Sequence, residues 1–368
     1  YHLENIKYKS KRGMCMNSKI KWLRNKLNGL NMQGMIVTNP VNIKYLTNIE
    51  AEGILLITRK ENIFLTDSRY IEHVNAILTI EDGIVAYNIK DLILDDYENF
   101  FLFCENVGFE ESHLTYLKYK EYMHKFRINN FEETEGIIEK QRMIKEEEEL
   151  EKIKKACSIT DDCFEHLKSF IKVGMSEKEI ANEIENFFLK NGADELAFDT
   201  IVASGKNSSM PHAVPTDKLI EPGDPITIDM GCKYKGYCSD MTRTIFAGFV
   251  PQYVKPIYDL VLRNQIQVAE NLKEGANIKL LSKSVENDFK LNGFDMLHSI
   301  GHGVGLDIHE YPFFGTRVDF LLKENMVVTD EPGIYIPNKF GVRIEDTLLI
   351  SKYSAISLTK SDKNYVIV

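Results

Sequence analysis

The stretch PITIDMGCKYKGYCSDMTRT, residues 225–244, is the part of the sequence from which the fold is best interpreted. It predicts a short apolar strand at 225–228 that ends in Asp229. A tight turn then leads into a returning strand at 237–246, which carries Asp240. Neighbouring strands lie less than about 5 Å apart, so both carboxylates can point at one spot. Two acids this close repel each other unless a positive group lies between them. Taken alone, one turn-capping Asp and one surface Asp are the simpler interpretation, but the downstream residues favour a shared site.

Length and composition place the chain among ordinary globular proteins. With 368 residues it is long enough for two domains and a large core. Its net charge of −10 and pI of about 5.5 argue against nucleic acid or an anionic membrane as the main partner. No apolar run is long enough to span a bilayer. We therefore expect a cytoplasmic protein with no nucleic-acid or membrane partner.

The N-terminus and the cysteines agree with that expectation. Residues 1–13 are polar and basic without an apolar core, so they do not resemble a secretory signal. A native start at Met14 or Met16 is expected, with a tag or translated leader before it. No pair of cysteines has C-x-x-C spacing, which favours reduced thiols over a zinc cage or disulfide framework. The six cysteines are Cys15, Cys104, Cys157, Cys163, Cys232 and Cys238.

The first third of the chain alternates between helical and strand patterns. A helix over about 19–30 is predicted by apolar residues at helical spacing, namely Ile20, Leu23, Leu27 and Leu30. Asn39-Pro40 is expected to end the strand that follows. The remaining predicted elements are strands at 35–38, 54–58, 63–66, 84–87 and 106–109 and helices at 67–76 and 92–103. This alternation is typical of a small three-layer α/β domain.

A charged run at 139–155 marks a change in composition, and we interpret it as the solvated face of a long helix. The buried stripe of that helix is predicted to be Leu150, Ile153, Cys157, Phe164, Leu167 and Ile171. Ser176 and Glu179 form a capping box for a second helix, which ends at Gly192. The domain boundary is placed near 136–142, giving domains at 14–138 and 139–368. The second domain is expected to be α+β, with helices at about 256–272 and 278–291.

Histidines and glycines gather in HSIGHGVGLDIHE, residues 298–310. Taken alone, G-H-G-V-G is a weak signal for a phosphate loop, since no helix follows at the required spacing. A single histidine is usually a core or surface residue. Three of them, His298, His302 and His309, within twelve positions and beside glycines that allow close backbone approach, are better explained by a site.

Two further acids lie at the ends of predicted strands. Glu331 precedes Pro332-Gly333, which ends a strand sharply. In the segment VRIE, alternation puts Arg343 and Glu345 on one face of a strand. For these two residues alone, an ordinary buried ion pair is an equally good interpretation.

Together the candidates are four carboxylates and one imidazole. An oxygen-rich set with one histidine favours Mn²⁺, Co²⁺, Fe²⁺ or Zn²⁺ over a thiolate zinc site. Four carboxylates exceed the need of one divalent ion, whereas two ions about 3.5–4 Å apart would balance them.

Motifs in both halves of the sequence resemble those of a known family. The segments TNPVNIKYLTN and TDSRY, then VASGKNSSMPHA, TIDMG, SDMTRT, GHGVGLDIHE, EPGIYI and GVRIED, occur in the order seen in the pita-bread (M24) metallopeptidases. The resemblance is to the Xaa-Pro aminopeptidase and prolidase group. It implies a creatinase-like α/β N-terminal domain and an α+β pita-bread catalytic domain. It also implies two divalent ions, Mn²⁺ first, peptides with proline second as substrates, and a homodimer.

The resemblance assigns roles residue by residue. The implied metal ligands are Asp229, Asp240, His302, Glu331 and Glu345, with Asp240 and Glu345 bridging the two ions. In that family a bridging hydroxide attacks the carbonyl before proline, and Glu331 is expected to help move the proton. The remaining implied roles are substrate binding and carbonyl polarisation by His212 and His309, pocket lining by His298 and orientation of the site by Arg343. The chain departs from the usual pattern at Ser299, Asp330 and Cys232, none of which removes a ligand.

Several functions stay open on the sequence alone. We expect an Xaa-Pro aminopeptidase first, and a strict Xaa-Pro dipeptidase as the alternative, because the ligands are common to both. A creatinase-type C–N hydrolase uses no metal, which the five intact ligands argue against. An inactive binding module would be expected to have lost ligands. Methionine aminopeptidases share the fold, but usually lack an N-terminal domain like residues 19–135.

Overall fold

The computed structural model describes residues 17–79 and 82–368. The expected start at Met14 or Met16 and the expected thiol of Cys15 lie outside these ranges. The five cysteines that are described are free. Within the same ranges, every helix is too short or too polar to cross a bilayer.

The chain separates into two compact units, divided between Gln141 and Arg142. Each unit has its own sheets and its own apolar core, and each is described by itself. The domain limits of 14–138 and 139–368 remain a prediction.

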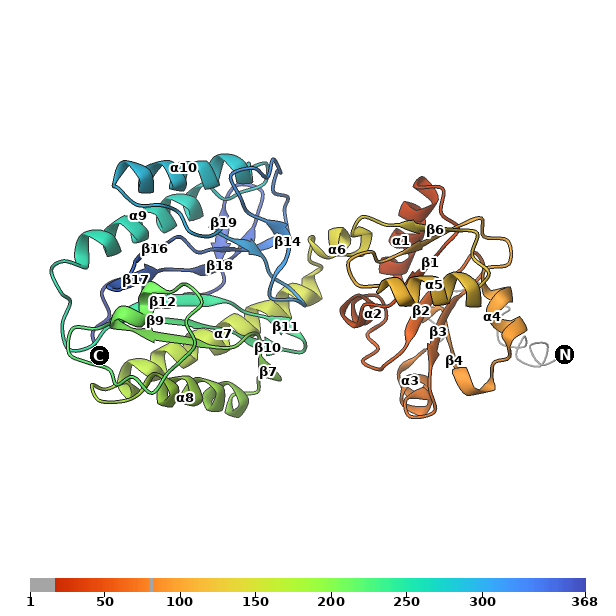
Figure 1. Ribbon diagram of the computed structural model, residues 1–368, viewed down its shortest axis with the longest axis horizontal. Coiled ribbons are helices and arrows are strands. Elements are labelled where there is room, and N and C mark those ends of the chain that lie inside the picture. Colours follow the sequence, from red (N-terminus) through yellow and green to blue (C-terminus); the bar gives the residue numbers. More distant parts are fainter. Residues whose placement is uncertain (1–16, 80–81) are drawn as a thin grey trace. The chain divides into compact units, whose positions relative to one another are not determined.

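The first unit is built on a mixed six-stranded sheet with the strand order β4-β3-β2-β1-β5-β6 (Figure 1). Strands β1–β5, β5–β6 and β3–β4 pair in parallel, whereas β2 pairs antiparallel with β1 and β3. The strands are β1 Gly34–Val37, β2 Ile54–Ile57, β3 Asn62–Thr66, β4 Ile84–Asn88, β5 Asn106–Phe109 and β6 Asn130–Glu133. The α-helices are α1 Ser18–Gly29, α2 Pro40–Thr47, α3 Ile71–Ile77, α4 Leu94–Phe100, α5 Tyr116–Lys125 and α6 Ile137–Arg142. The α/β class predicted for this unit is therefore confirmed.

One helix in this unit was missed, and two local predictions were wrong. Strand β1 ends at Val37, before Asn39-Pro40 as predicted. The same pair also begins helix α2, because proline suits the first helical turn and the Asn39 side chain accepts a 2.9 Å hydrogen bond from Val41 N. Helix α3 begins at Ile71, since residues 67–70 form a turn. Leu30 is 53 % exposed, so the buried stripe of α1 stops at Leu27.

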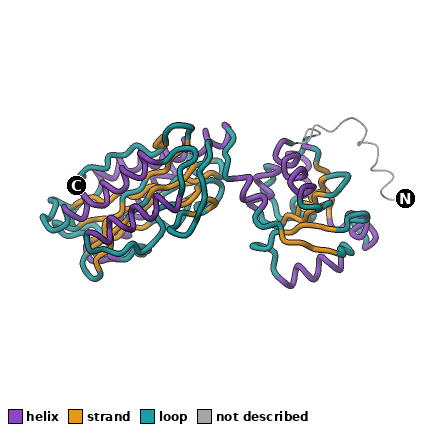
Figure 2. The backbone as a smooth tube through the Cα atoms, turned by 90° about the horizontal axis from the view of Figure 1, so that it is seen from above, coloured by secondary structure: helices purple, strands orange, loops and turns teal. Residues whose placement is uncertain are grey.

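The second unit has two helix pairs that cover strands from opposite sides (Figures 1 and 2). The helices are α7 Glu147–Phe170, α8 Glu177–Lys190, α9 Lys255–Asn271 and α10 Ile278–Leu291. The strands of the first half are β7 Glu195–Leu196, β8 Ile201–Ser204, β9 Pro225–Met230, β10 Cys232–Tyr234, β11 Tyr237–Cys238 and β12 Met241–Phe246. Those of the second half are β13 His302–Gly303, β14 Glu310–Phe313, β15 Val327–Asp330, β16 Gly333–Ile336, β17 Phe340–Arg343, β18 Asp346–Ile350 and β19 Ala355–Ser357.

Two apolar cores correspond to the two helix pairs. One joins α7 and α8 to strands β8, β9 and β12, and the other joins α9 and α10 to β15–β18. The six residues of the predicted α7 stripe are all buried. Ser176 and Glu179 form the predicted capping box of α8, with the Ser176 hydroxyl accepting from Glu179 N at 3.2 Å. The sequence thus predicted the buried face of α7 and the start of α8.

Short breaks in the strands are the feature that positions the site. The predicted continuous strand 237–246 was wrong, because Ser239–Asp240 interrupts it between β11 and β12. Likewise Glu331–Pro332 separates β15 from β16, and Ile344–Glu345 separates β17 from β18. Arg343 therefore ends β17 and Glu345 lies in the break that follows, so the two do not share one strand face as predicted. A carboxylate in such a break is held by flanking strands on both sides, which restricts its backbone.

Candidate metal centre

Three of the predicted ligands come together in a buried cluster. Asp240, His302 and Glu345 each offer one ligand atom, and these atoms lie within 4.8 Å of one another. Their exposed fractions are 4 %, 7 % and 2 %. Asp240 and Glu345 lie in strand breaks, and His302 begins β13. Three segments that are far apart in the sequence thus converge on one spot.

The hydrogen bonds of His302 direct one ring nitrogen toward the acids. Nδ1 lies 3.1 Å from the Gly303 carbonyl oxygen, so Nδ1 carries the proton and donates it. Nε2 then presents a lone pair, 3.5 Å from Asp240 Oδ2 and 3.4 Å from Glu331 Oε1. This is the tautomer of a histidine that ligates a metal through Nε2. A lone pair facing two carboxylates is favourable when a cation lies between them.

Asp229 and Glu331 complete the set of acids. Asp229 lies in β9 and accepts a hydrogen bond from Arg343 Nη2 at its Oδ2, at 2.7 Å. Its other oxygen, Oδ1, is buried and has no hydrogen-bond partner among the described residues. An unpartnered buried carboxylate oxygen is costly unless an ion or water binds it. Glu331 is joined to the cluster through His302.

The acids of the cluster are strongly perturbed. Burial, followed by the charges of Asp229 and Glu331, raises the pKa of Asp240 well above its usual range. Burial, followed by the Asp240, Glu331 and Asp229 charges, does the same to the pKa of Glu345. For Glu331, burial is again the main cause, and its pKa rises to about 8 although Arg343 opposes the shift. Cations that neutralise the cluster would remove these costs.

The donor set fits divalent ions. Four carboxylates and a neutral imidazole nitrogen are hard to borderline ligands, suited to Mn²⁺, Co²⁺, Fe²⁺ or Zn²⁺. The described thiols do not contribute, because the metal-ligand cluster contains no cysteine. The unpartnered Asp229 oxygen and the lone pair of His302 are both explained by ions bound here.

Arg343 is the hub of the polar contacts around the acids. Besides Asp229, its guanidinium donates to Thr242 Oγ1 at 3.1 Å, to Pro211 O at 3.1 Å and to Tyr335 Oη at 2.6 Å. It is 3 % exposed. Arg343 therefore fixes one carboxylate and also the loop that begins at Pro211.

Sequence reasoning missed two residues that orient the ligands. Tyr335 accepts from Arg343 and donates to His298 Nε2 at 2.9 Å, while His298 Nδ1 donates to Ser299 O at 2.6 Å. Thr242 donates to Glu345 Oε2 at 2.7 Å. Thr242 lies in the motif SDMTRT, two positions after Asp240, and Tyr335 lies in EPGIYI, two positions after Gly333. These positions inside the motifs were the signal that could have identified the two residues.

The other predicted histidines lie near the cluster. The His309 ring stands edge-on to His302, with centroids 4.3 Å apart. His309 and His212 are both exposed. Burial lowers the pKa of His309. The charge of Asp229 opposes this shift, and the neighbouring His212 adds to it. His212 follows Pro211, whose carbonyl is bound by Arg343. Both rings are therefore accessible beside the acids, as side chains that bind a substrate would need to be.

Asp330 and Asp346 form a second layer of charge next to two of the predicted ligands. They are paired across β15 and β18, and Gln265 Nε2 lies 3.3 Å from Asp330 Oδ2 and 3.2 Å from Asp346 Oδ2. Arg243 and Lys363 bind Asp346 at 2.7 and 2.6 Å. Burial, followed by the Asp346 charge, raises the pKa of Asp330 well above its usual range. The unusual acid at position 330 thus belongs to a hydrogen-bonded cluster that joins α9 to the two strands.

The metal-free protein should lose stability as the pH rises from 6.5 to 8. Glu331 keeps its proton in the folded state up to about pH 8 but loses it near 4.5 when unfolded. Unfolding then releases a proton, so the free energy of unfolding falls with pH, by about 2 kcal/mol over this window for one carboxyl group. Asp240 and Glu345 shift in the same direction.

Histidines oppose this loss only in the lower part of the window. Burial lowers the pKa of His298 and His302 to about 4, so their opposite contribution, a gain of stability with rising pH, ends about one pH unit above the ordinary histidine pKa of about 6.5. The free energy of unfolding of chelator-treated protein should be measured by denaturant titration at several pH values across the window. The Glu345→Gln variant should show a shallower dependence of that free energy on pH. A flat or rising dependence in the metal-free protein would contradict the raised carboxyl pKa values.

Comparison with known proteins identifies the family. Residues 151–352 match metallopeptidase family M24, and residues 19–144 match the creatinase/prolidase N-terminal domain. This chain belongs to metallopeptidase family M24, with a creatinase-like N-terminal domain. The predicted family and the pita-bread fold class are therefore confirmed. Membership of a metallopeptidase family implies divalent metal ions.

Individual relatives cover nearly the whole chain. The Xaa-Pro dipeptidase of Pyrococcus horikoshii is 35 % identical, over 95 % of this chain and 99 % of the relative. The structure of an Xaa-Pro dipeptidase from Bacillus anthracis aligns with a TM-score of 0.90 and 38 % identity, over 95 % of this chain and 99 % of the other. An X-Pro aminopeptidase from Thermotoga maritima aligns with a TM-score of 0.84 and 31 % identity, over 93 % and 100 %.

Proposed function

We propose that this chain is an Xaa-Pro dipeptidase (prolidase) that uses two divalent metal ions, Mn²⁺ first among them. The sequence alone put an Xaa-Pro aminopeptidase first and the dipeptidase second. The observation that reverses this order is the likeness, at 35–38 % identity over nearly full length, to two proteins named Xaa-Pro dipeptidase. The aminopeptidase from Thermotoga maritima, at 31 %, keeps that activity as the second candidate.

In this proposal the ions are held by the cluster of acids and His302. The proposed ligands are Asp229, Asp240, His302, Glu331 and Glu345. When bound, the ions would supply Lewis-acid activation of water and of the peptide carbonyl, as divalent ions do in hydrolases. The support for this ligand set is the burial of Asp240 and Glu345, the lone pair of His302 and the unpartnered Asp229 oxygen.

The remaining residues would bind substrate and move protons. Glu331 would take a proton from the attacking water and pass it to the leaving nitrogen of proline. The accessible rings of His212 and His309 would donate hydrogen bonds to the substrate carbonyl as charge develops on its oxygen. Arg343 would keep Asp229 and Tyr335 in place. His298 has both nitrogens engaged, so it would line the pocket with its ring.

Substrate length tests the proposal directly. Mn²⁺-loaded protein should hydrolyse Ala-Pro and should cleave Ala-Pro-Gly at least about tenfold more slowly, a difference of about 1.4 kcal/mol in transition-state binding. Initial rates would be compared at low substrate concentration, with Ala-Gly as the control lacking proline. Faster cleavage of Ala-Pro-Gly would make the protein an aminopeptidase.

Blocking the substrate amine separates both peptidase assignments from other chemistry. The acidic cluster should favour a free, cationic amine close to it, so N-acetyl-Ala-Pro should be a poor substrate. Equal rates for acetylated and free peptides would overturn both exopeptidase assignments.

A further inference from the structure

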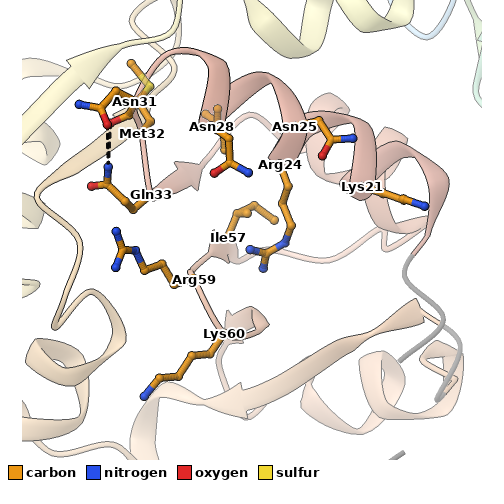
Figure 3. Close-up of a pocket in the computed structure, with 11 residues that line it drawn as sticks. Lys21, Arg24, Asn25, Asn28, Asn31, Met32, Gln33, Ile57, Arg59 and Lys60 are labelled. Carbon is orange, nitrogen blue, oxygen red and sulfur yellow. Dashed lines mark hydrogen bonds between the residues drawn. The ribbon is translucent and has the colours of Figure 1, made fainter. Parts of the chain in front are cut away.

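A pocket of about 510 Å³ lies in the first unit, between helix α1 and the turn 58–61 that joins β2 to β3 (Figure 3). Pockets that hold small-molecule ligands commonly have volumes of about 300–1,000 Å³. All residues that line it belong to this unit, whereas every proposed metal ligand belongs to the second unit. The pocket therefore needs an explanation of its own.

The pocket is lined by cations and by no acid. Lys21 and Arg24 come from α1, and Arg59 and Lys60 come from the turn. We call this site the basic pocket. Within the described residues 17–79 and 82–368, none of these four side chains forms an ion pair with an Asp or Glu. A solvated surface could carry such charges, and Lys60 also interacts with the neighbouring Glu61 carboxyl group. Four cations without an ion pair around one concavity are nevertheless unusual in a chain with a net charge of −10.

Arg24 distinguishes the basic pocket from a merely solvated surface. Its guanidinium donates to Thr58 O, to Glu61 O at 3.1 Å and to Asn62 Oδ1 at 2.7 Å, which are all neutral acceptors. Its Nε is buried and has no hydrogen-bond partner among the described residues. Neutral oxygens fix the orientation of the guanidinium without cancelling its charge. The wall of the pocket thus holds an immobilised positive charge.

The second arginine faces the same space from the turn. In Figure 3 the Arg24 side chain extends from α1 toward the turn, and Arg59 extends from the turn toward Gln33. Arginine recognises phosphate oxygens with paired N–H donors, and it is preferred where planar, bidentate contacts are made. Most N–H donors of Arg24 are already used by Thr58, Glu61 and Asn62, so Arg24 supplies a fixed charge, and Arg59 is the arginine that can give the paired donors.

The remaining lining matches the uncharged part of a ligand. Leu27, Met32 and Ile57 are buried and give the pocket an apolar floor. Asn25 and Asn28 lie on the helix face that also carries Arg24, at spacings that place them side by side. Apolar contact beside amide groups suits a ring with hydroxyls. The pocket, with its charged walls and its partly apolar floor, has more volume than a single inorganic anion would fill.

We propose that the basic pocket binds a phosphorylated small molecule of nucleotide size, with its phosphates between Arg24 and Arg59 and its ring on the apolar floor. Lys60 and Lys21 contribute positive charge at the rim. This site would bind a ligand independently of peptide hydrolysis.

The test is calorimetric titration of the metal-loaded full chain with ADP, pyrophosphate, adenosine and citrate. ADP should bind more tightly than pyrophosphate, and adenosine and citrate should bind much more weakly. Affinity for ADP should fall as salt is added, since the contact is ionic. The absence of ADP binding up to roughly 5 mM, an affinity weaker than about −3 kcal/mol, would overturn the proposal. If citrate bound as tightly as ADP, the pocket would not recognise phosphate specifically, and the proposal would be overturned.

Variants distinguish ADP binding in the basic pocket from ADP binding at the metal centre. Arg59→Ser with Lys60→Ser should weaken ADP at least about tenfold, while Lys90→Ser with Lys120→Ser, an equal loss of exposed charge in the same unit, should not. Arg59 and Lys60 are exposed, so circular dichroism should show that this variant keeps its fold. Arg24 is a less suitable position for substitution, because its side chain also holds the turn through a hydrogen bond to Glu61 O. Unchanged ADP affinity in the Arg59/Lys60 variant would place the ligand elsewhere and refute the proposal.

Discussion

Replacing Glu345 with glutamine is expected to lower kcat/KM for Ala-Pro by about 10³-fold or more and to reduce the bound metal. The estimate follows because divalent ions contribute several kcal/mol to transition-state stabilisation, and each 1.36 kcal/mol is a factor of ten. Glutamine has the shape of glutamate and can still accept the 2.7 Å hydrogen bond from Thr242. The variant therefore removes a charge and little else. Activity and metal content should be measured on the same sample.

Asp240→Asn should behave in the same way, because Asp240 and Glu345 are the two proposed bridging ligands and lie within one cluster. Glu324→Gln, at an exposed position, is the matched control and should leave both quantities unchanged. If either bridging variant kept normal turnover and two ions per chain, the proposed two-metal centre would be wrong.

Replacing His212 with alanine should separate substrate binding from metal binding. We expect kcat/KM to fall by about 10²-fold, as for the loss of one hydrogen-bond donor to a developing oxyanion. The metal content should stay at the wild-type value, because His212 is exposed and has no hydrogen bond to the acids. His166→Ala, on the outer helix pair beside Glu183, is the control and should change neither quantity. Loss of metal in the His212 variant would make His212 a ligand.

Helix faces were predictable because their signals are local. The buried stripe of α7 and the capping box of α8 depend on residues within a few turns of each other, and both agree with the structure. Helix α2 was missed because Asn39-Pro40 is compatible with both the end of a strand and the start of a helix. The local sequence did not distinguish the two.

The strand breaks were not predictable from alternation. Period-2 patterns continue through Ser239–Asp240 and Ile344–Glu345, yet the structure interrupts the strands at both places. The cause is pairing with distant strands. For example, Glu345 N donates to Thr242 O at 3.0 Å, a contact between segments about 100 residues apart. A single sequence carries no direct signal for such a contact.

The residues that the fold brings together, Asp240, His302 and Glu345, were predictable from the sequence, and the residues that orient them were less so. Motifs identified the acids and His302, because carboxylates and imidazole are the groups that such divalent ions favour. Tyr335 and Thr242 orient those groups through hydrogen bonds to Arg343, His298 and Glu345, which depend on tertiary packing. Residue type alone does not identify a tyrosine or a threonine as an orienting group.

The measurement that tests the central claim most directly is a metal titration of chelator-treated protein. Bound Mn²⁺ and the rate of Ala-Pro hydrolysis would be determined on each sample as the metal is added. We expect no hydrolysis without metal, a rate that rises with bound Mn²⁺, and saturation at about two ions per chain, as in two-metal hydrolases. Full activity in metal-free protein, or saturation without any increase in Ala-Pro hydrolysis, would contradict the proposed metal-dependent dipeptidase.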